Sequence, residues 1–352
     1  MRHAMKVAAV MSAAALTLAA CGNSDNGSGS TDTSSSSSSA AKKLKVGMAY
    51  DVGGRGDQSF NDAAARGLDK AKSDLGVDAK EAAAVNGENE AAREERLQQL
   101  IDAGYTHVVA VGFAYAEAVG KVAKANPDVH FAIVDDASDA SKGPNVDQIT
   151  FAENEGSFLV GAAAALKSKT GHIGFVGGVN VPLIKKFEAG YIAGAKKVNP
   201  NIKIDSQYLT QPPDFSGFGD PAKGKTAAEG MYQKGADVVY HAAGGSGGGV
   251  FAAAKAAGKM AIGVDSDQAL TAPADVKDVI ITSMIKKVDV AVYDFIKSAS
   301  DGTELTGNKV YDLKSGGVDY STTGGHIDDI KSKLDAFKQD IIDGKIKVPT
   351  TP

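Results

Sequence analysis

The sequence predicts an α/β fold with two doubly wound parallel sheets. Short apolar runs alternate with helix-like segments, and their nearly continuous apolar character is typical of strands buried on both faces. About 310 residues follow a polar N-terminal segment, a length that suits two domains better than one core. The expected strands are residues 44–50, 107–112, 129–135, 149–152, 172–176, 202–209, 238–242, 260–265 and 279–283.

The N-terminus has the pattern of an export signal. Residues 1–20 carry Arg2 and Lys6 before an apolar stretch that is too short to span a membrane comfortably. The ending Leu-Ala-Ala-Cys resembles the bacterial lipobox, in which the cysteine is diacylated and becomes the N-terminus. An ordinary signal that ends near a cysteine by chance is the alternative. Cys21 is the only cysteine in the chain, so a lipidated protein has no disulfide.

Residues 21–42 are rich in Ser and Gly and predict a flexible tether that holds a globular body off a membrane. Several acyl chains on one cysteine would make that attachment stable. Loss of residues 1–20 leaves 36 basic residues against 43 acidic ones, a net charge of −7. Such a charge gives no basis for nucleic-acid binding, which needs a basic surface.

Polar residues and glycines gather where the expected strands end. In open parallel sheets, ligands bind at the carboxyl ends of strands, so these positions are the candidate site. Their Asp, Asn, Lys and Gly residues and few aromatics favour a pocket for a polar small molecule. The segments are residues 51–61, 112–113, 135–136, 177–187, 244–249, 265–268 and 286–287.

The first of these segments, "DVGGRGDQSFND", allows three interpretations: a phosphate loop, an exposed Arg-Gly-Asp adhesion motif, or the rim of a pocket. It lacks the Gly-Lys-Ser/Thr ending of a nucleotide-triphosphate loop, and Arg-Gly-Asp is common by chance. The pocket rim is therefore favoured. Its glycines allow a tight turn after the strand, and Ser59 is expected to cap a helix that begins at Phe60.

Catalytic patterns are weak. Gly247-x-Gly249-x-x-Ala252, with Asp265 at the end of the next strand, fits a dinucleotide fingerprint and makes an NAD-dependent oxidoreductase a distant alternative. An exported protein would have little access to NAD. The chain has no Gly-x-Ser-x-Gly elbow, and its six histidines show no ligand spacing. We therefore expect no catalysis, no cofactor and no metal.

Residues 151–200, "FAENEGSFLVGAAAALKSKTGHIGFVGGVNVPLIKKFEAGYIAGAKKVNP", closely resemble the basic membrane protein family, also called PnrA-like or Med. The similarity continues in "DQSFND", "FAIVDD", "YHAAGGSGGGVFAAAKAAGK", "IGVDSDQ" and "ITSMIKKVDVAVYDFIK", and it covers the chain from Lys45 to about Lys297. Members are substrate-binding lipoproteins of ABC transporters.

The resemblance implies a two-lobed periplasmic-binding-protein fold of the first type, with a hinge of three crossovers. The expected first lobe is residues 43–150 plus about 284–315, and the second is residues 151–283 plus about 316–352. Characterised members bind purine nucleosides in the cleft and deliver them to a permease. We thus expect a monomeric, lipid-anchored protein on the extracytoplasmic face of the cell membrane. A sensor or carrier for another polar ligand, such as a sugar, is the closer alternative.

The resemblance also implies roles for single residues. Asn61 would hydrogen-bond the base, with Asp57 nearby and Phe60 beneath. Phe187 would stack on the base, and Asp265 would accept hydrogen bonds from two ribose hydroxyls. The remaining ligand contacts would come from Asp135, Lys286 and the backbone of Gly244 and Gly245.

One position departs from the family pattern. Some members have a second stacking aromatic three residues after the asparagine, where this chain has Ala64. Phe60, Phe113 or Tyr115 could supply that second face, or the stacking could be one-sided. Purely structural roles are also open at this stage: Phe187 as a core residue, Asp265 as a helix cap and Lys286 as a solvated charge.

Overall fold

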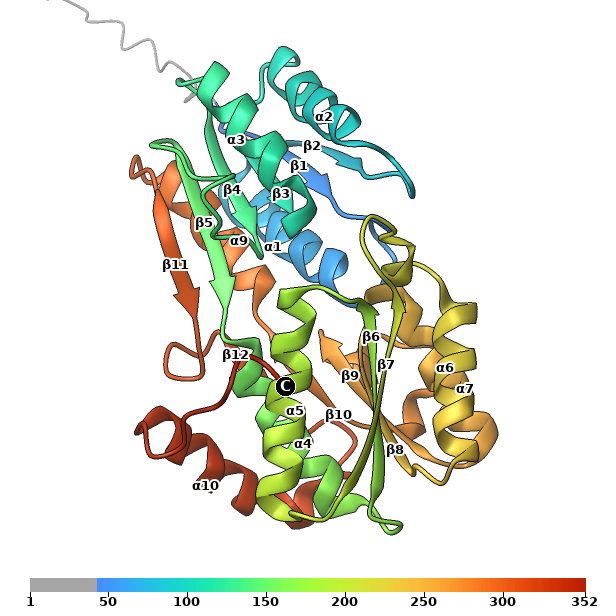
Figure 1. Cartoon of the computed structure of the whole chain (residues 1–352). Helices are drawn as coiled ribbons and strands as arrows, with labels where there is room; N and C mark the ends of the chain where they lie inside the picture. The colour runs from blue at the N-terminus through green and yellow to red at the C-terminus, as the bar shows by residue number, and fades with distance from the viewer. Residues whose placement is uncertain (1–42) are drawn as a thin grey trace, which may run out of the picture. The chain divides into compact units, whose positions relative to one another are not determined.

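The computed structural model describes residues 43–352, which contain two six-stranded sheets. The strand order is β11-β5-β4-β3-β1-β2 in the first sheet and β12-β10-β9-β8-β6-β7 in the second (Figure 1). We call the first sheet with its helices lobe 1 and the second sheet with its helices lobe 2. The expected signal peptide, Cys21 and the tether lie outside the described residues.

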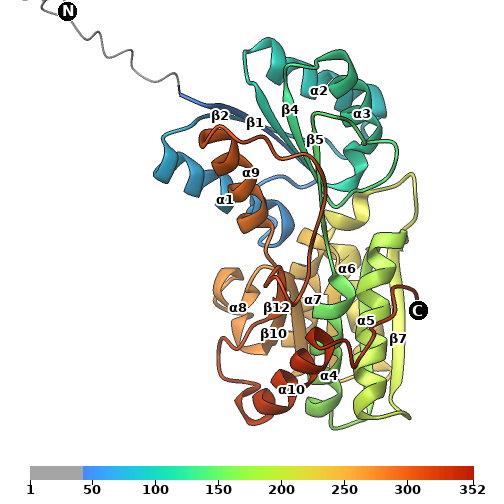
Figure 2. The ribbon, with the colours of Figure 1, turned by 90° about the vertical axis from the view of Figure 1, so that its left-hand side faces the viewer.

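Lobe 1 is a fully parallel sheet covered on both faces. Helices α1 and α9 lie against one face, and α2 and α3 lie against the other (Figure 2). The strands are β1 (Lys45–Tyr50), β2 (Asp78–Ala83), β3 (His107–Val111), β4 (His130–Val134), β5 (Val146–Phe151) and β11 (Gly307–Tyr311). The helices are α1 (Phe60–Leu75), α2 (Glu90–Asp102), α3 (Ala116–Ala125) and α9 (Val288–Ser300).

Lobe 2 repeats this plan, except that its edge strand β12 runs antiparallel to β10. Helices α4 and α5 pack together, as do α6 and α7. The strands are β6 (His172–Val179), β7 (Lys203–Thr210), β8 (Val238–Ala242), β9 (Met260–Asp265), β10 (Ile280–Lys286) and β12 (Val318–Tyr320). The helices are α4 (Glu153–Lys167), α5 (Pro182–Val198), α6 (Pro221–Gln233), α7 (Gly247–Ala257), α8 (Gln268–Thr271) and α10 (Lys331–Ile342).

The chain passes between the sheets three times: after β5, after β10, and between β11 and β12. Strand β10 stays in the second sheet as far as Lys286. The lobe boundary expected after residue 283 therefore lies three residues too early, because the strand continues to the hinge.

Each of the nine expected strands overlaps a strand of the structure. The strands that the sequence did not predict are β2, β11 and β12, and all three lie at sheet edges. An edge strand has no neighbouring strand on its outer side, so more of its side chains reach solvent. Strands β2 (DAKEAA) and β11 (GNKVY) therefore lack the continuous apolar character of central strands.

Candidate functional site

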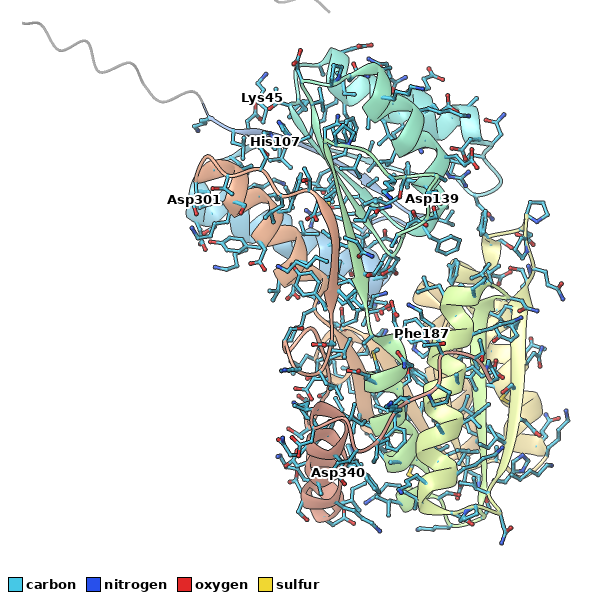
Figure 3. All side chains as sticks on the ribbon, turned by 60° about the vertical axis from the view of Figure 1, so that its left-hand side comes forward. Lys45, His107, Asp139, Phe187, Asp301 and Asp340 are labelled. Carbon is cyan, nitrogen blue, oxygen red and sulfur yellow. The ribbon has the colours of Figure 1, made fainter. Side chains whose placement is uncertain are left out.

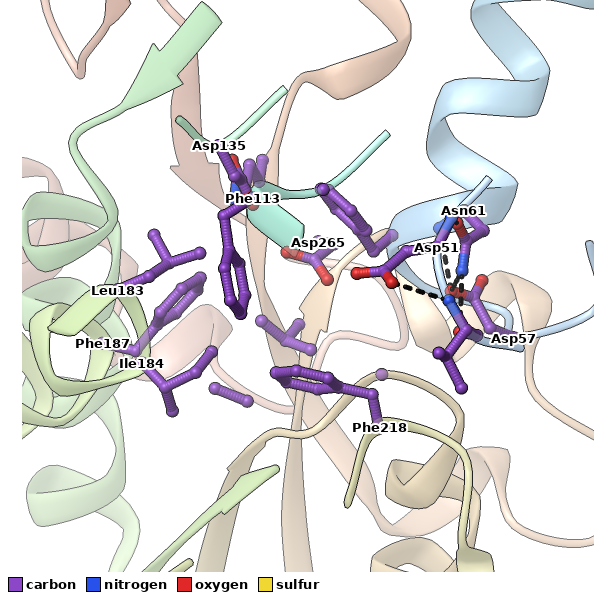
Figure 4. Close-up of a pocket in the computed structure, with 17 residues that line it drawn as sticks. Asp51, Asp57, Asn61, Phe113, Asp135, Leu183, Ile184, Phe187, Phe218 and Asp265 are labelled. Carbon is purple, nitrogen blue, oxygen red and sulfur yellow. Dashed lines mark hydrogen bonds and ion pairs between the residues drawn. The ribbon is translucent and has the colours of Figure 1, made fainter. Parts of the chain in front are cut away.

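A pocket lies between the two lobes, at the carboxyl ends of their parallel strands (Figure 4). It contains about 540 Å³ of empty space, part of which is open to solvent. The lining residues are Asp51, Val52, Asp57, Phe60, Asn61, Gly112, Phe113, Asp135, Leu183, Ile184, Phe187, Phe218, Ala242, Gly244, Val264, Asp265 and Lys286.

Two carboxylates enter the pocket from equivalent places in the two lobes. Asp135 directly follows β4, Asp265 ends β9, and each of these strands is third in the order of its sheet. Both residues have left-handed backbone conformations, with φ of 71° and 62°. This conformation is uncommon outside glycine and is typical of functional sites. Each aspartate thus turns its strand end toward the ligand space instead of continuing the strand.

A buried cation joins these acids. The Lys286 ammonium group lies 2.6 Å from Asp135 and 3.2 Å from Glu153, which begins α4. Burial alone lowers the pKa of Lys286, but the nearby carboxylates of Asp135, Glu153 and Asp265 outweigh it and raise that pKa. The alternative of a solvated charge at Lys286 is wrong, because only 1% of its side chain is exposed.

The acids outnumber this one cation. Burial raises the pKa of Asp135 and of Asp265, and the charge of Glu153 raises both further, although Lys286 opposes the shift. Asp135 Oδ1 is buried and has no hydrogen-bond partner among the described residues. The site can therefore accept hydrogen bonds from a ligand, and ligand O–H or N–H groups would stabilise the ionised carboxylates.

The loop after β1 supplies a further carboxylate and an amide. Burial raises the pKa of Asp51 to about 6, and one of its oxygens accepts a hydrogen bond from the backbone N–H of Val52. Asn61 Oδ1 accepts from the backbone N–H of Asp51 at 3.0 Å, and Asn61 Nδ2 donates to Asp57 at 3.1 Å. Asn61 thus fixes the shape of the loop while its side chain lines the pocket.

Asp57 holds the start of helix α1. Its carboxylate accepts hydrogen bonds from the backbone N–H groups of Ser59, Asn61 and Asp62, at 2.8–3.1 Å. Ser59 occupies the N-cap position of the helix, as expected, but its side chain makes no capping hydrogen bond. Its hydroxyl instead donates to Asp265 of lobe 2 at 2.8 Å. The capping hydrogen bonds come from Asp57, which also lines the pocket.

Aromatic rings form much of the remaining wall. Phe187 lies near the end of α5 that faces lobe 1 (Figure 3), and it shares the pocket with Phe60, Phe113 and Phe218. The rings of Phe113 and Phe218 meet edge to face, with centroids 6.4 Å apart. The sequence did not single out Phe218, which lies in the loop between β7 and α6, several residues after the end of its strand.

Two of the three candidates for the second stacking aromatic line the pocket. Tyr115 is fully buried, and its hydroxyl donates to the carbonyl oxygen of Tyr50, so it does not line the pocket. Phe60 and Phe113 do line it. Ala64, at the position that departs from the family pattern, is buried in the core of lobe 1.

Most of the expected ligand-binding residues lie in this one pocket: Asp57, Phe60, Asn61, Asp135, Phe187, Gly244, Asp265 and Lys286. Gly245 does not line it and borders a neighbouring cavity beside Asp57. The lining residues absent from the expected set include Asp51, Leu183, Ile184 and Phe218. Asp51, Leu183 and Ile184 lie in strand-end segments, so the rule of strand ends could have found them.

The glycine run after β8 has a packing role. A Cβ at Gly247 would lie 1.9 Å from the His241 ring, and one at Gly249 would lie 1.8 Å from the carbonyl oxygen of Pro221. These two glycines therefore let α7 approach β8 and α6 closely. Their spacing is explained without a bound pyrophosphate.

Within residues 43–352, no group of His, Cys, Asp and Glu side chains is arranged to hold a metal ion. No helix in this part of the chain is both long and apolar enough to cross a membrane.

Sequence and structure comparisons agree on the family. Residues 43–352 match the model of the PnrA-like ABC transporter substrate-binding proteins. The chain is 40% identical to the CD4+ T-cell-stimulating antigen of Listeria monocytogenes, over 97% of this chain and 96% of that protein. It is 39% identical to the ABC transporter nucleoside-binding protein BmpA of Lactococcus lactis, over 87% of this chain and 89% of that protein.

A solved ABC transporter solute-binding protein from Aeropyrum pernix superimposes with a TM-score of 0.76 and 31% identity, covering 87% of this chain and 93% of that one. The fold is thus the expected two-lobed one of periplasmic binding proteins. The hypothesis of an NAD-dependent oxidoreductase is wrong, because these relatives are binding proteins and not dehydrogenases. The chain belongs to the PnrA-like family of ABC transporter substrate-binding proteins.

Proposed function

We propose that the protein binds a purine nucleoside between its lobes and delivers it to the permease of an ABC importer. The observation that carries this proposal is the pairing, in one pocket, of a wall of phenylalanine rings with strand-end carboxylates. A flat base stacks on aromatic rings, and vicinal ribose hydroxyls donate well to a carboxylate.

The charges of the pocket favour a nucleoside over a nucleotide. Asp51, Asp135 and Asp265 all line the pocket, and its one ammonium group, that of Lys286, is already bonded to Asp135. A phosphate would meet excess negative charge from these buried carboxylates, and repulsion is stronger beside buried charges than in open water. A neutral ligand with several O–H and N–H donors avoids this cost.

The name of the Lactococcus lactis relative, a nucleoside-binding protein with 39% identity, supports the same ligand class. A sugar is the alternative ligand, and the strand-end carboxylates alone would suit it as well. The apolar side of the pocket, with Leu183, Ile184 and Phe187 together, favours a ligand that also has a large flat ring.

Isothermal titration of the purified protein tests the ligand. The titrants are inosine, guanosine, adenosine, AMP, adenine and ribose. We expect at least one nucleoside to bind more tightly than its free base, its monophosphate and ribose. Tighter binding of AMP or ribose than of every nucleoside would contradict the proposal.

We also propose that the protein is lipid-anchored at Cys21 on the extracytoplasmic face. The support is the Leu-Ala-Ala-Cys ending and the polar stretch after it. In cell fractionation, Cys21→Ala should move the protein from the membrane to the soluble or secreted fraction. Ser28→Ala, in the same polar stretch, should not. A membrane-bound Cys21→Ala protein would place the anchor elsewhere.

A further inference from the structure

The segment between β7 and α6, residues 211–220, reaches from lobe 2 toward lobe 1. We call it the strap. Within lobe 2 it is braced by Ser246, whose hydroxyl donates to the carbonyl oxygen of Gly217 at 2.7 Å and accepts from the backbone N–H of Asp220 at 2.8 Å. Ser246 is fully buried. The strap therefore moves with lobe 2 as part of that lobe.

Phe215 of the strap contacts lobe 1 outside the ligand pocket. Its ring meets the ring of Phe113 edge to face, with centroids 5.8 Å apart and planes at 75°. The guanidinium carbon of Arg93, on helix α2, lies 5.8 Å from the centre of the same ring. Phe215 is not a lining residue, whereas its strap neighbour Phe218 is one. The strap thus makes two separate contributions, one to the pocket wall and one to the contact between lobes.

Arg93 is held in place for this contact. Its side chain is only 6% exposed and lies 3.5 Å from Glu88 and 3.6 Å from Glu90. Its Nε atom has no hydrogen-bond partner among the described residues. A guanidinium group that is largely removed from water is attracted to an aromatic face more strongly than an exposed one. The Arg93–Phe215 pair is therefore suited to hold the lobes together.

A second set of contacts between the lobes does not involve Phe215. The Ser266 hydroxyl donates to the carbonyl oxygen of Ser59 at 2.8 Å, and Gln268 Nε2 donates to that of Gln58 at 3.1 Å. Both sets must break when the lobes separate. A change at Phe215 that shifts the equilibrium between open and closed forms must therefore also weaken the contacts of residues 58–59 with residues 264–268.

We propose that the strap is a latch, in which Phe215 docks on Arg93 and Phe113 to hold the lobes closed and so slow the exit of the bound ligand. The role in closure is independent of what the ligand is. Only the effect on ligand release rests on the proposed nucleoside function.

Hydrogen exchange of the ligand-free, full-length protein tests the closure role. Phe215→Ala should speed amide exchange both in the strap and at residues 58–61 and 264–268, which Phe215 does not touch. Gln211→Ala, an exposed position of the same strap, should leave both regions unchanged. Faster exchange confined to the strap would show that Phe215 only packs within its own surroundings, and this result would overturn the proposal. Phe215→Leu, which keeps the apolar volume and removes the ring, should give the same pattern as Phe215→Ala to a smaller extent.

Stopped-flow release of 2-aminopurine riboside, chased with excess inosine, tests the kinetic role. We expect Phe215→Leu and Arg93→Gln each to release the probe about 2- to 30-fold faster, the range that corresponds to the strength of a cation–π pair. The double variant should be no faster than the faster single one, because both changes break one contact. Additive effects, or unchanged release, would overturn the latch. Failure of the wild-type protein to bind any nucleoside would contradict the proposed ligand, and hydrogen exchange would still decide the closure role.

Discussion

The ammonium group of Lys286 lies 2.6 Å from the carboxylate of Asp135, and this ion pair joins the two lobes. Lys286 ends β10 of the second sheet, and Asp135 follows β4 of the first. The contact therefore lies at the hinge and in the pocket wall at once. A ligand that donates to Asp135 acts on a residue whose charge already helps to hold the lobes together.

Replacement of Lys286 by Met should destabilise the protein strongly. The change leaves Asp135 buried without its cation and Glu153 with Lys186 as its remaining partner, and removal of one partner from a buried ion pair costs about 3–5 kcal/mol. Urea unfolding at pH 7.5 measures the loss. Lys287→Met, at the neighbouring position that has no ion pair among the described contacts, should cost much less. Equal losses in the two variants would show that the buried cluster adds little.

The loss in Lys286→Met should shrink at lower pH. The pKa values of Asp135 and Asp265 are already raised by burial, and loss of the cation raises them further. Protonation of these acids removes the unpaired charge, so the variant should recover part of its stability between pH 7.5 and pH 5.5. A loss that stays constant over this range would contradict the electrostatic explanation.

The central part of each sheet could be predicted from the sequence, because strands buried on both faces must be apolar throughout. The edge strands β2 and β11 could not, because solvent on their outer sides permits polar residues. Strand β12 could not either, because its 3 residues are too few to form a pattern. The strand-end rule led to Asp135, Asp265 and Lys286 without any knowledge of the ligand.

What the sequence could not predict depends on how the lobes meet. Phe218 enters the pocket from the strap, and no local pattern shows which way a loop turns. Ser59 has the residue type of a helix cap, yet the approach of Asp265 from lobe 2 gives its hydroxyl another partner, and Asp57 takes the capping role. The tendency of a serine at this position to cap its own helix was therefore outweighed by a hydrogen bond between residues about 200 positions apart.

Phe187→Leu should weaken nucleoside binding by about 1–3 kcal/mol, the value of one stacked ring. Phe187 is also 3% exposed and belongs to the core, so the unliganded protein should lose about 1 kcal/mol of stability. Phe175→Leu is the matched control, because Phe175 is a fully buried core residue that does not line the pocket. Titration and thermal melting of both variants separate the roles. A Phe187 variant that resembles the Phe175 variant, less stable with unchanged affinity, would make Phe187 a packing residue only.

Nucleoside affinity should increase as the pH rises from 5 to 7.5. Burial raises the pKa of Asp51 to about 6, and an N–H donor of the ligand binds the ionised carboxylate better than the protonated one. Binding should therefore release protons near pH 6, which titration in two buffers of different ionisation enthalpy detects. Asp51→Asn should reduce this proton release. Asp147→Asn should not, because burial also raises the pKa of Asp147 to about 6 but this residue lies outside the pocket.

The raised pKa of Asp51 has the opposite effect on the stability of the unliganded protein, which should fall as the pH rises. The pKa of Asp51 is higher in the folded state than the value of about 3.9 for an unfolded chain. The folded protein therefore holds more protons between about pH 4 and pH 6, and its free energy of unfolding should fall as the pH rises through this window. Urea unfolding of wild type and Asp51→Asn at both limits measures this contribution. A wild-type slope identical to that of the variant would show that Asp51 does not titrate there.

Asp265→Asn should weaken nucleoside binding by about 1–3 kcal/mol, because the amide keeps the shape of the side chain but loses the charge that strengthens its bonds to two hydroxyls. Asp267→Asn is the control: its carboxylate accepts from Ser321 at 2.7 Å and from Thr323, and it does not line the pocket. A 2′-deoxynucleoside has already lost one hydroxyl, so it should bind wild type more weakly and suffer less from the substitution. Titration of both proteins with both ligands gives a thermodynamic cycle, in which the two losses should not add. Fully additive losses would mean that Asp265 does not contact the 2′-hydroxyl.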